Sequence, residues 1–355
     1  MLGAESVVLN LARLSRDFGY RSIVAVPWEN GLPEPQLLTR CHEAGVATLP
    51  LHCQTQFSLS PFMALRRAVV SEDVTLVHAH GYREDAYALA AAQGRPLVAT
   101  NHLWKRTSPR LRLYAHLDGR LLRQFDEVVA VSQPILNEMA DLQIGRLSHV
   151  FNGVDVDGLL QQPEDSGLAE LYAPGLPVAL TVSSLTTEKG LDMAIAAVSA
   201  LRREGTRVAL GIVGSGPEES SLRRQVREDG LEGQVKFLGR RSDVGSLLKA
   251  AEIFLLPSRN EGLPIALLEG MACSCAVAAT RVGDVSAAVD DGESGLLCLP
   301  NVPSMTDALR RLVNDTGLRT KLSRRAHEVV SAKFSARAMA RGYAAVYDRA
   351  LSRKG

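Results

Sequence analysis

Short apolar segments alternate with helical periodicity along most of the chain, and this alternation limits the possible folds more than any other feature. The first series of strand-like runs lies at 23–26, 46–51, 76–79, 97–100 and 128–131. The second lies at 178–182, 208–213, 235–238, 253–256 and 276–279. Continuous apolar runs are typical of strands buried on both faces, as in parallel sheets covered by helices. The sequence therefore predicts an α/β protein with two Rossmann-like, doubly wound domains.

A polar, turn-rich stretch separates the two series. It begins near 152–155 and continues through Pro163, Gly167 and Pro177. We predict an N-terminal domain over residues 1–157 and a C-terminal domain over 158–335, facing each other across a cleft. The last helix, in 336–355, is expected to pack back on the first domain. Doubly wound sheets bind ligands beyond the carboxyl ends of their strands, so we expect the site in that cleft.

Charge and cysteine content exclude several classes of protein. The 40 basic and 39 acidic side chains nearly cancel, which argues against nucleic acid as the main partner. The five cysteines form neither a disulfide framework nor C-x-x-C pairs, which favours a reducing compartment and no metal site. No apolar run reaches the ~18 residues of a membrane span. We predict a cytoplasmic protein with no metal or cofactor.

The segment 258–269 carries the strongest chemical signal. Glu261 lies in a polar loop after a strand, and Glu269 interrupts the apolar face of the next helix. Pro264 suits the first turn of that helix, whose N-terminus favours an anion such as a phosphate. A buried carboxylate needs hydrogen-bond donors, which makes Glu269 the more informative of the two. The alternative is that Glu261 only complements the helix N-terminus and Glu269 caps a neighbouring loop.

Glu261 and Glu269, with seven residues between them, resemble the E-x7-E signature of retaining glycosyltransferases with the GT-B fold, most of all family 4. Other segments resemble the motifs of this family in the same order: N-G-V-D at 152–155, a glycine turn at 214–217, F-L-G at 237–239 and D-G-x-x-G-L-L at 291–297. The resemblance implies metal-independent transfer of a sugar from a nucleotide-diphosphate donor. The acceptor would be a glycan or a lipid-linked molecule of cell-envelope polysaccharide or lipopolysaccharide synthesis.

The same resemblance assigns roles to residues. Glu269 would bind the donor ribose, Glu261 would lie beside the donor sugar, and Lys189 would reach the diphosphate. His102 falls where the family has a histidine near the reacting sugar; alternatively it is structural, as is common for a histidine at a strand end. The implied catalytic residues are His102, Glu261 and Lys189. The implied donor-binding residues are Gly3, Ser184, Lys189, Gly214, Gly216, Leu238, Glu261, Gly262, Leu263, Pro264 and Glu269.

Two departures from the family pattern stand out. Ser184 occupies the position where an arginine is expected, and losing one preorganised donor to a leaving group can lower a rate by ~10²–10³. Arg259 is one candidate to replace that arginine. The chain also begins inside the first glycine loop, so the first domain is expected to lack its first strand and to expose backbone edges on both neighbours. We expect a start assigned too late or a shortened chain.

A basic segment after residue 103 suggests the acceptor. Lys105, Arg106, Arg110 and Arg112 lie among apolar side chains, a pattern that suits an anionic membrane, a lipid-linked diphosphate or an anionic polysaccharide. The alternative is a solvated helix face. We predict acceptor or membrane contact here, with a peripheral location on the inner face of the plasma membrane. Two other functions stay open: a non-catalytic nucleotide-sugar binder or partner subunit, and a sugar-nucleotide epimerase.

Overall fold

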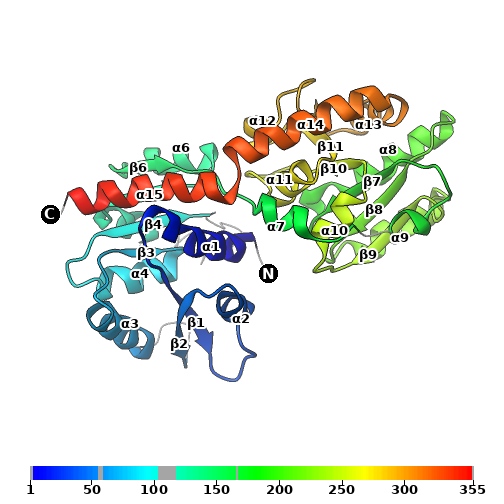
Figure 1. Ribbon diagram of the computed structural model, residues 1–355. Helices are drawn as coiled ribbons and strands as arrows, with labels where there is room; N and C mark the ends of the chain where they lie inside the picture. Colours follow the sequence, from blue (N-terminus) through cyan, green and yellow to red (C-terminus); the bar gives the residue numbers. More distant parts are fainter. Residues whose placement is uncertain (1–2, 55–58, 103–116, 165–166, 354–355) are drawn as a thin grey trace. The chain divides into compact units, whose positions relative to one another are not determined.

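A computed structural model describes residues 3–54, 59–102, 117–164 and 167–353 (Figure 1). The chain divides into two compact units. The first combines Met1–Gly153 with Ala336–Gly355, and the second is Val154–Ser335. Among the helices within these ranges, none is both long and apolar enough to cross a bilayer.

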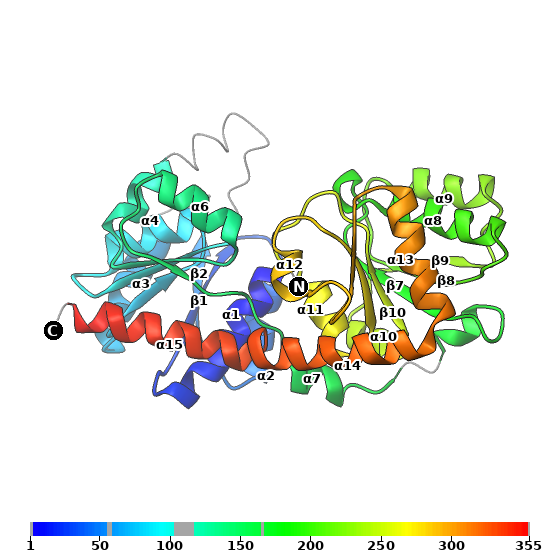
Figure 2. The ribbon, with the colours of Figure 1, turned by 90° about the horizontal axis from the view of Figure 1, so that it is seen from above.

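The second unit is built on a six-stranded parallel sheet in the order β12-β11-β10-β7-β8-β9. Figure 2 labels β7, β8, β9 and β10 of this sheet. The chain enters at β7 in the middle, runs outward to β9, then returns to the other side of β7 and runs outward to β12. This is the Rossmann strand order, and its switch point lies between β7 and β10. The strands are β7 (Val178–Val182), β8 (Ala209–Val213), β9 (Val235–Gly239), β10 (Ile253–Leu256), β11 (Ala276–Thr280) and β12 (Leu296–Cys298).

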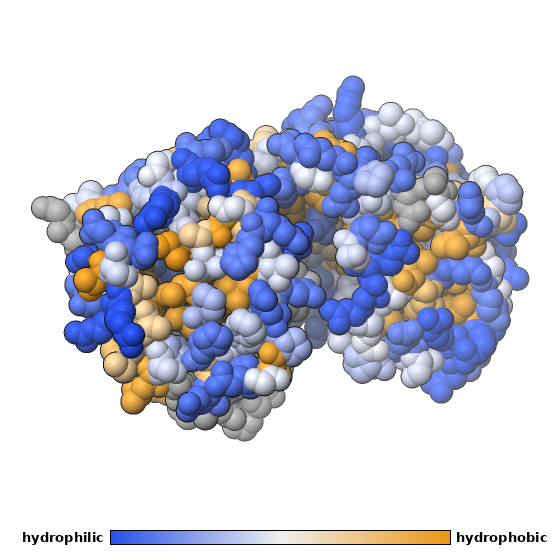
Figure 3. Space-filling model, turned by 60° about the horizontal axis from the view of Figure 1, so that its bottom comes forward, coloured by the Kyte–Doolittle hydropathy of each residue, from blue (hydrophilic) through white to orange (hydrophobic). Residues whose placement is uncertain are grey.

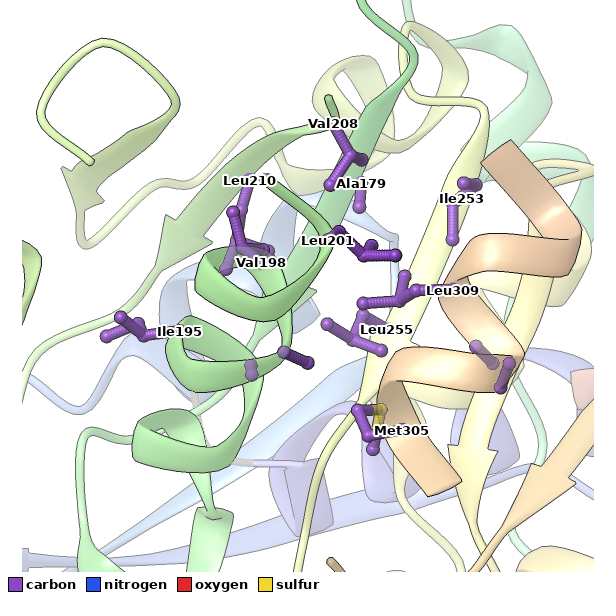
Figure 4. Packing of buried hydrophobic residues seen from close by; sticks show 14 of the residues in the cluster. Ala179, Ile195, Val198, Leu201, Val208, Leu210, Ile253, Leu255, Met305 and Leu309 are labelled. Carbon is purple, nitrogen blue, oxygen red and sulfur yellow. The ribbon is translucent and has the colours of Figure 1, made fainter. Parts of the chain in front are cut away.

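Helices cover both faces of this sheet, and strand β10 shows why. Ile253 and Leu255 join the core under α8 and α13 (Figure 4). Phe254 points the other way, against Gly270 of α11, where an added Cβ would lie 2.6 Å from its ring. Successive strand residues face opposite sides, so an unbroken apolar run is required. The helices are α7 (Val156–Gln161), α8 (Leu191–Arg203), α9 (Glu219–Glu228), α10 (Val244–Lys249), α11 (Ile265–Ala272), α12 (Val285–Ala288), α13 (Val302–Asn314) and α14 (Thr316–Lys333).

The first unit has two parallel sheets instead of one. Strand β1 pairs with β2, and a separate sheet has the order β3-β4-β5-β6. Within the described residues, β1 and β3 each keep one edge without a partner strand. The strands are β1 (Ile23–Glu29), β2 (Ala47–Cys53), β3 (Val77–Ala79), β4 (Leu97–Asn101), β5 (Glu127–Ala130) and β6 (Leu147–His149).

Helices of the first unit surround both sheets, and the C-terminal helix belongs here. Helix α15 packs on α1, β4 and β5, and it buries Met339, Tyr343 and Tyr347. The unit is thus assembled from both ends of the chain. Its helices are α1 (Gly3–Leu14), α2 (Gln36–Glu43), α3 (Leu59–Ser71), α4 (Tyr82–Ala91), α6 (Gln133–Asp141) and α15 (Ala336–Ser352).

Candidate active site

The loops that follow β7, β8, β10 and β11 are bonded to one another at the switch point of the second unit. The Ser183 N–H donates to the Val213 carbonyl at 3.0 Å, and the Gly214 N–H donates to the Gly239 carbonyl at 2.8 Å. The Arg259 N–H donates to the Glu188 carbonyl at 2.7 Å. Such loops beyond the carboxyl ends of the strands form the ligand site of doubly wound domains.

Two glycines allow these loops to approach each other closely. Gly214 has φ +136°, and an added Cβ would lie 1.8 Å from the Ser183 carbonyl oxygen. Gly190 has φ +63°, and its added Cβ would lie 2.0 Å from the Pro257 carbonyl oxygen. A side chain at either position would be strained in its backbone and would collide with the neighbouring loop. The predicted glycine turn at 214–217 therefore packs directly against the loop that follows β7.

Lys189 and Glu261, two predicted catalytic residues, form an ion pair in this group of loops. Lys189 ends a short 3₁₀ turn, and its Nζ lies 2.8 Å from Glu261 Oε1. The Ser258 hydroxyl donates to the same carboxylate oxygen at 2.7 Å. Ser258 is buried, and its carbonyl accepts a hydrogen bond from the Thr280 hydroxyl at 2.6 Å. Strands β10 and β11 thus fix the Glu261 carboxylate, which in turn holds the lysine.

Two hydroxyls beside Ser184 have no hydrogen-bond partner in the described part of the chain. They are Ser183 Oγ and Thr186 Oγ1, and both atoms are buried. A buried polar group without a partner costs about 1–3 kcal/mol. Both lie in the loop between β7 and Lys189, so a polar ligand at this loop could provide the missing partners.

Glu269 lies on α11 with a carboxylate that accepts no hydrogen bond from the residues described. Burial raises the pKa of this carboxyl from 4.5 to about 7. Pro264 is the N-cap of α11 and does not lie in its first turn as predicted, since the helix begins at Ile265. Gly262 is exposed and Leu263 is buried. The hydroxyl groups of a ligand would satisfy the Glu269 carboxylate and favour its charged form.

The raised pKa of Glu269 predicts a pH-dependent stability. Between pH 4.5 and about 7 the unfolded chain has released this proton while the folded chain still holds it. The free energy of unfolding should therefore fall as the pH rises through this window, by about 1.4 kcal/mol per unit of pKa shift. Glu269→Gln should remove the contribution of this carboxyl to the pH dependence of the free energy of unfolding. Urea unfolding at pH values across the window tests it, and equal slopes for both proteins would contradict it.

Leu238, one of the predicted donor-binding residues, lies at the end of β9 beside the glycine loop. The Leu185 N–H donates to the Ser215 carbonyl at 3.0 Å, and the Glu218 N–H donates to the Leu185 carbonyl at 3.0 Å. Gly216 packs directly on Leu185, because an added Cβ would lie 2.3 Å from the Leu185 carbonyl oxygen. The ends of β7, β8 and β9 are therefore joined by backbone hydrogen bonds.

Ser184 is exposed at the position where an arginine was expected. Arg259, the predicted substitute, is engaged elsewhere: its guanidinium donates to the Asp192 carboxylate at 2.6 and 2.8 Å and to the Thr187 carbonyl at 2.7 Å. The same hydrogen bonds lower the pKa of Asp192. Arg259 therefore stabilises the start of α8, and Lys189 is the cation that contacts Glu261.

His102 lies in the first unit within a group of hydrogen-bonded histidines. Its Nε2 lies 3.1 Å from His80 Nδ1, so that one of the two nitrogens donates. His78 is held from both sides, at 2.8 Å from the Tyr347 hydroxyl and at 2.8 Å from the Thr100 hydroxyl. Burial lowers the pKa of His102 to about 4 and that of His78 to about 3. These rings are neutral at pH 7 and can donate or accept hydrogen bonds.

The depressed pKa values of these histidines predict acid sensitivity. Below pH 6.5 the unfolded chain takes up protons that the folded first unit does not bind until about pH 4 at His102. The free energy of unfolding should therefore fall as the pH drops through this range. His80→Gln should weaken this dependence, because it removes one ring whose own pKa is lowered by burial. Thermal unfolding between pH 7 and pH 4 measures the effect, and an unchanged acid slope would count against it.

The structure gives little information on the remaining predicted residues. Gly3 is the first residue of α1. Lys105, Arg106, Arg110 and Arg112 lie outside the described residues. Among the residues that are described, no three His, Cys, Asp or Glu side chains are grouped to hold a metal ion.

Sequence reasoning missed two polar residues of this site. Ser258 begins the segment singled out for its carboxylates, but its contact with Glu261 was not foreseen. Thr280 ends the fifth strand of the second series and is fully buried. A hydroxyl residue directly after an apolar parallel strand, like Ser258 after Pro257, is the signal that could have found both.

Comparison with known proteins identifies relatives of this chain. Residues 170–329 match the family described as Glycosyl transferases group 1, and residues 2–157 match Glycosyltransferase Family 4. An uncharacterized glycosyltransferase of Methanocaldococcus jannaschii is 28% identical over 80% of this chain and 78% of its own. The lipopolysaccharide core biosynthesis glycosyltransferase LpsE of Rhizobium meliloti is 30% identical over 62% of this chain and 64% of its own.

The solved structures agree on the architecture. Anabaena HepE in complex with UDP superposes with a TM-score of 0.81 at 21% identity, over 98% of this chain and 96% of its own. At this identity the likeness shows the fold, which has two Rossmann-like domains. With both units matched by sequence as well, the chain belongs to the family 4 glycosyltransferases of the GT-B fold.

Proposed function

We propose that the protein transfers a sugar from a uridine-diphosphate donor to a glycan or lipid-linked acceptor, with retention of configuration and without a metal ion. The pathway would be the synthesis of cell-envelope polysaccharide or lipopolysaccharide, as for LpsE. The observation that carries the proposal is the Lys189–Glu261–Ser258 group at the switch point of the second unit. The UDP bound in the complex of HepE supports uridine as the base.

The proposed roles follow from these contacts. The diphosphate would replace Glu261 as the counterion of Lys189, and Glu261 would then accept hydrogen bonds from the sugar. Glu269 would accept from the ribose hydroxyls. As the bond from the anomeric carbon to the diphosphate breaks, the acceptor oxygen would bond on the same face and lose its proton to the departing diphosphate. His102 would lie near the reacting sugar, on the acceptor-binding unit.

A nucleotide panel tests the donor, and an activity assay tests the reaction. UDP and UDP-sugars should raise the melting temperature by mass action more than GDP- or ADP-sugars do. Hydrolysis or transfer should then persist in a chelator. Binding without turnover would support a non-catalytic binder, and an epimerised donor without transfer would support an epimerase. Either result would overturn the proposal.

Substitution of Ser184 tests its alignment with the arginine of the family. Ser184→Arg should preserve UDP binding and strengthen it about tenfold, because a guanidinium can donate two hydrogen bonds to a phosphate. Thr320→Arg, which adds the same charge to an exposed position of α14, should leave the affinity unchanged. Titration calorimetry gives both values. A clear loss of UDP affinity in Ser184→Arg would refute the alignment at this position.

A further inference from the structure

Helix α3 of the first unit carries an unusual row of exposed apolar side chains. Leu59 is 80% exposed, Met63 53% and Val70 61%. Spacings of four and seven residues place them on one side of the helix. Most large apolar side chains of a monomeric protein are at least partly buried, and a continuous exposed group of them marks a site of interaction. Orange surface is visible on the unit that contains α3 in Figure 3.

The opposite side of α3 is anchored in the unit. Pro61 and Val69 are buried, and the helix packs on β2 and α4. The Ser60 hydroxyl donates to the His52 carbonyl at 3.0 Å, which ties the start of the helix to β2. The exposed row therefore lies on a helix that is already folded and fixed.

Two arginines accompany the apolar row. Arg66 and Arg67 are exposed, and neither guanidinium has an ion pair or hydrogen bond with the residues described. The helix contains no acidic residue. Glu72 follows its end and is paired with Arg21 at 3.4 Å. The outer face of α3 thus combines apolar side chains with uncompensated positive charge.

We propose that this outer face, formed by Leu59, Met63, Arg66, Arg67 and Val70, docks the protein on an anionic lipid surface. Apolar side chains that enter the headgroup region and arginines that contact lipid phosphates are the two parts of such binding. A symmetric dimer fits less well, because a two-fold axis through this face would place its arginines near their own copies. The proposal does not rest on the donor assigned above.

Fluorescent labelling tests which face meets the lipid. All five cysteines are buried, so Met63→Cys adds an accessible thiol for an environment-sensitive dye. Leu299→Cys, at a leucine of the second unit with a similar exposed fraction (60%, against 53% for Met63), is the matched control. The emission of the dye at position 63 should shift to the blue with phosphatidylglycerol vesicles and not with pure phosphatidylcholine. No shift, or the same shift at position 299, would overturn the proposal.

Charge reversal tests the role of the arginines. Arg66→Glu with Arg67→Glu should lower partitioning onto anionic vesicles about tenfold or more, with a matching loss of salt dependence. Arg324→Glu with Arg325→Glu, which makes the same charge change on α14, should have little effect. Equal partitioning of both double variants would overturn the proposal. A different pair of results would also overturn it: light scattering shows a dimer that Leu59→Ser dissociates, and the unsubstituted protein does not bind vesicles.

Discussion

Lys189→Ala is expected to lower turnover by about 10²–10³, the effect of removing one preorganised group that stabilises a leaving charge. Lys189 Nζ contacts Glu261 in the free protein, and in the proposed function it would be the cation that contacts the diphosphate. The variant also leaves the Glu261 carboxylate, which is only 10% exposed, without its counterion. We therefore expect the loss mainly in kcat, since the charge on the diphosphate grows in the transition state.

Lys321→Ala is the matched control for this experiment. Lys321 pairs with Glu293 at 3.4 Å on the exposed surface of the same unit, and an exposed pair contributes little to stability. Single-turnover measurement of donor cleavage separates chemistry from product release. If Lys189→Ala keeps the turnover of Lys321→Ala while its melting temperature is unchanged, the assignment of Lys189 is wrong.

Gly214→Ala is expected to have the largest effect on the second unit itself. The new Cβ would lie 1.8 Å from the Ser183 carbonyl oxygen, in a backbone conformation with φ +136°. The loops after β7 and β8 must then separate, and the hydrogen bond from the Gly214 N–H to Gly239 is strained. We expect a loss of about 3 kcal/mol in the free energy of unfolding and a melting temperature ~10 °C lower. Nucleotide affinity should fall with it.

Gly205→Ala isolates the effect of the collision. Gly205 also has a left-handed φ, +82°, but an added Cβ would meet no atom within 4 Å. Its expected cost is only the backbone strain, about 1 kcal/mol. Calorimetric unfolding and UDP titration of both variants give the comparison. Equal destabilisation by the two substitutions would show that the contact of the Gly214 loop with Ser183 is unimportant.

Much of the fold was predictable because buried parallel strands leave a strong sequence signal. All ten predicted strand-like runs overlap strands of the structure. Strands β6 and β12, of three residues each, were not predicted. The sequence predicted exposed strand edges in the first unit, but it did not predict that the unit divides into two sheets.

The candidate site was predictable where residue type determines chemistry and unpredictable where packing decides. Lys189 and Glu261 were chosen by motif, but their ion pair depends on how two loops meet. Arg259 was predicted as a candidate to replace the missing arginine. Its bidentate contact with Asp192, a residue 67 positions away, could not be predicted from the local sequence. The pairing of His80 with His102 likewise depends on two neighbouring strand ends, which no local pattern reveals.

The assignment of α15 to the first unit has a consequence for how the protein is made. The second unit is one continuous segment, Val154–Ser335, whereas the first needs Ala336–Gly355 to complete it. Domains generally fold as units, and N-terminal ones first, during synthesis. Here that order should not hold, because the first unit cannot complete its fold until α15, which carries Tyr343 and Tyr347, has been synthesised. Until then the sheet of the first unit keeps α4 on β3 and β4 but lacks α15 on β4 and β5. A chain that ends before residue 336 should therefore be susceptible to protease in its first half.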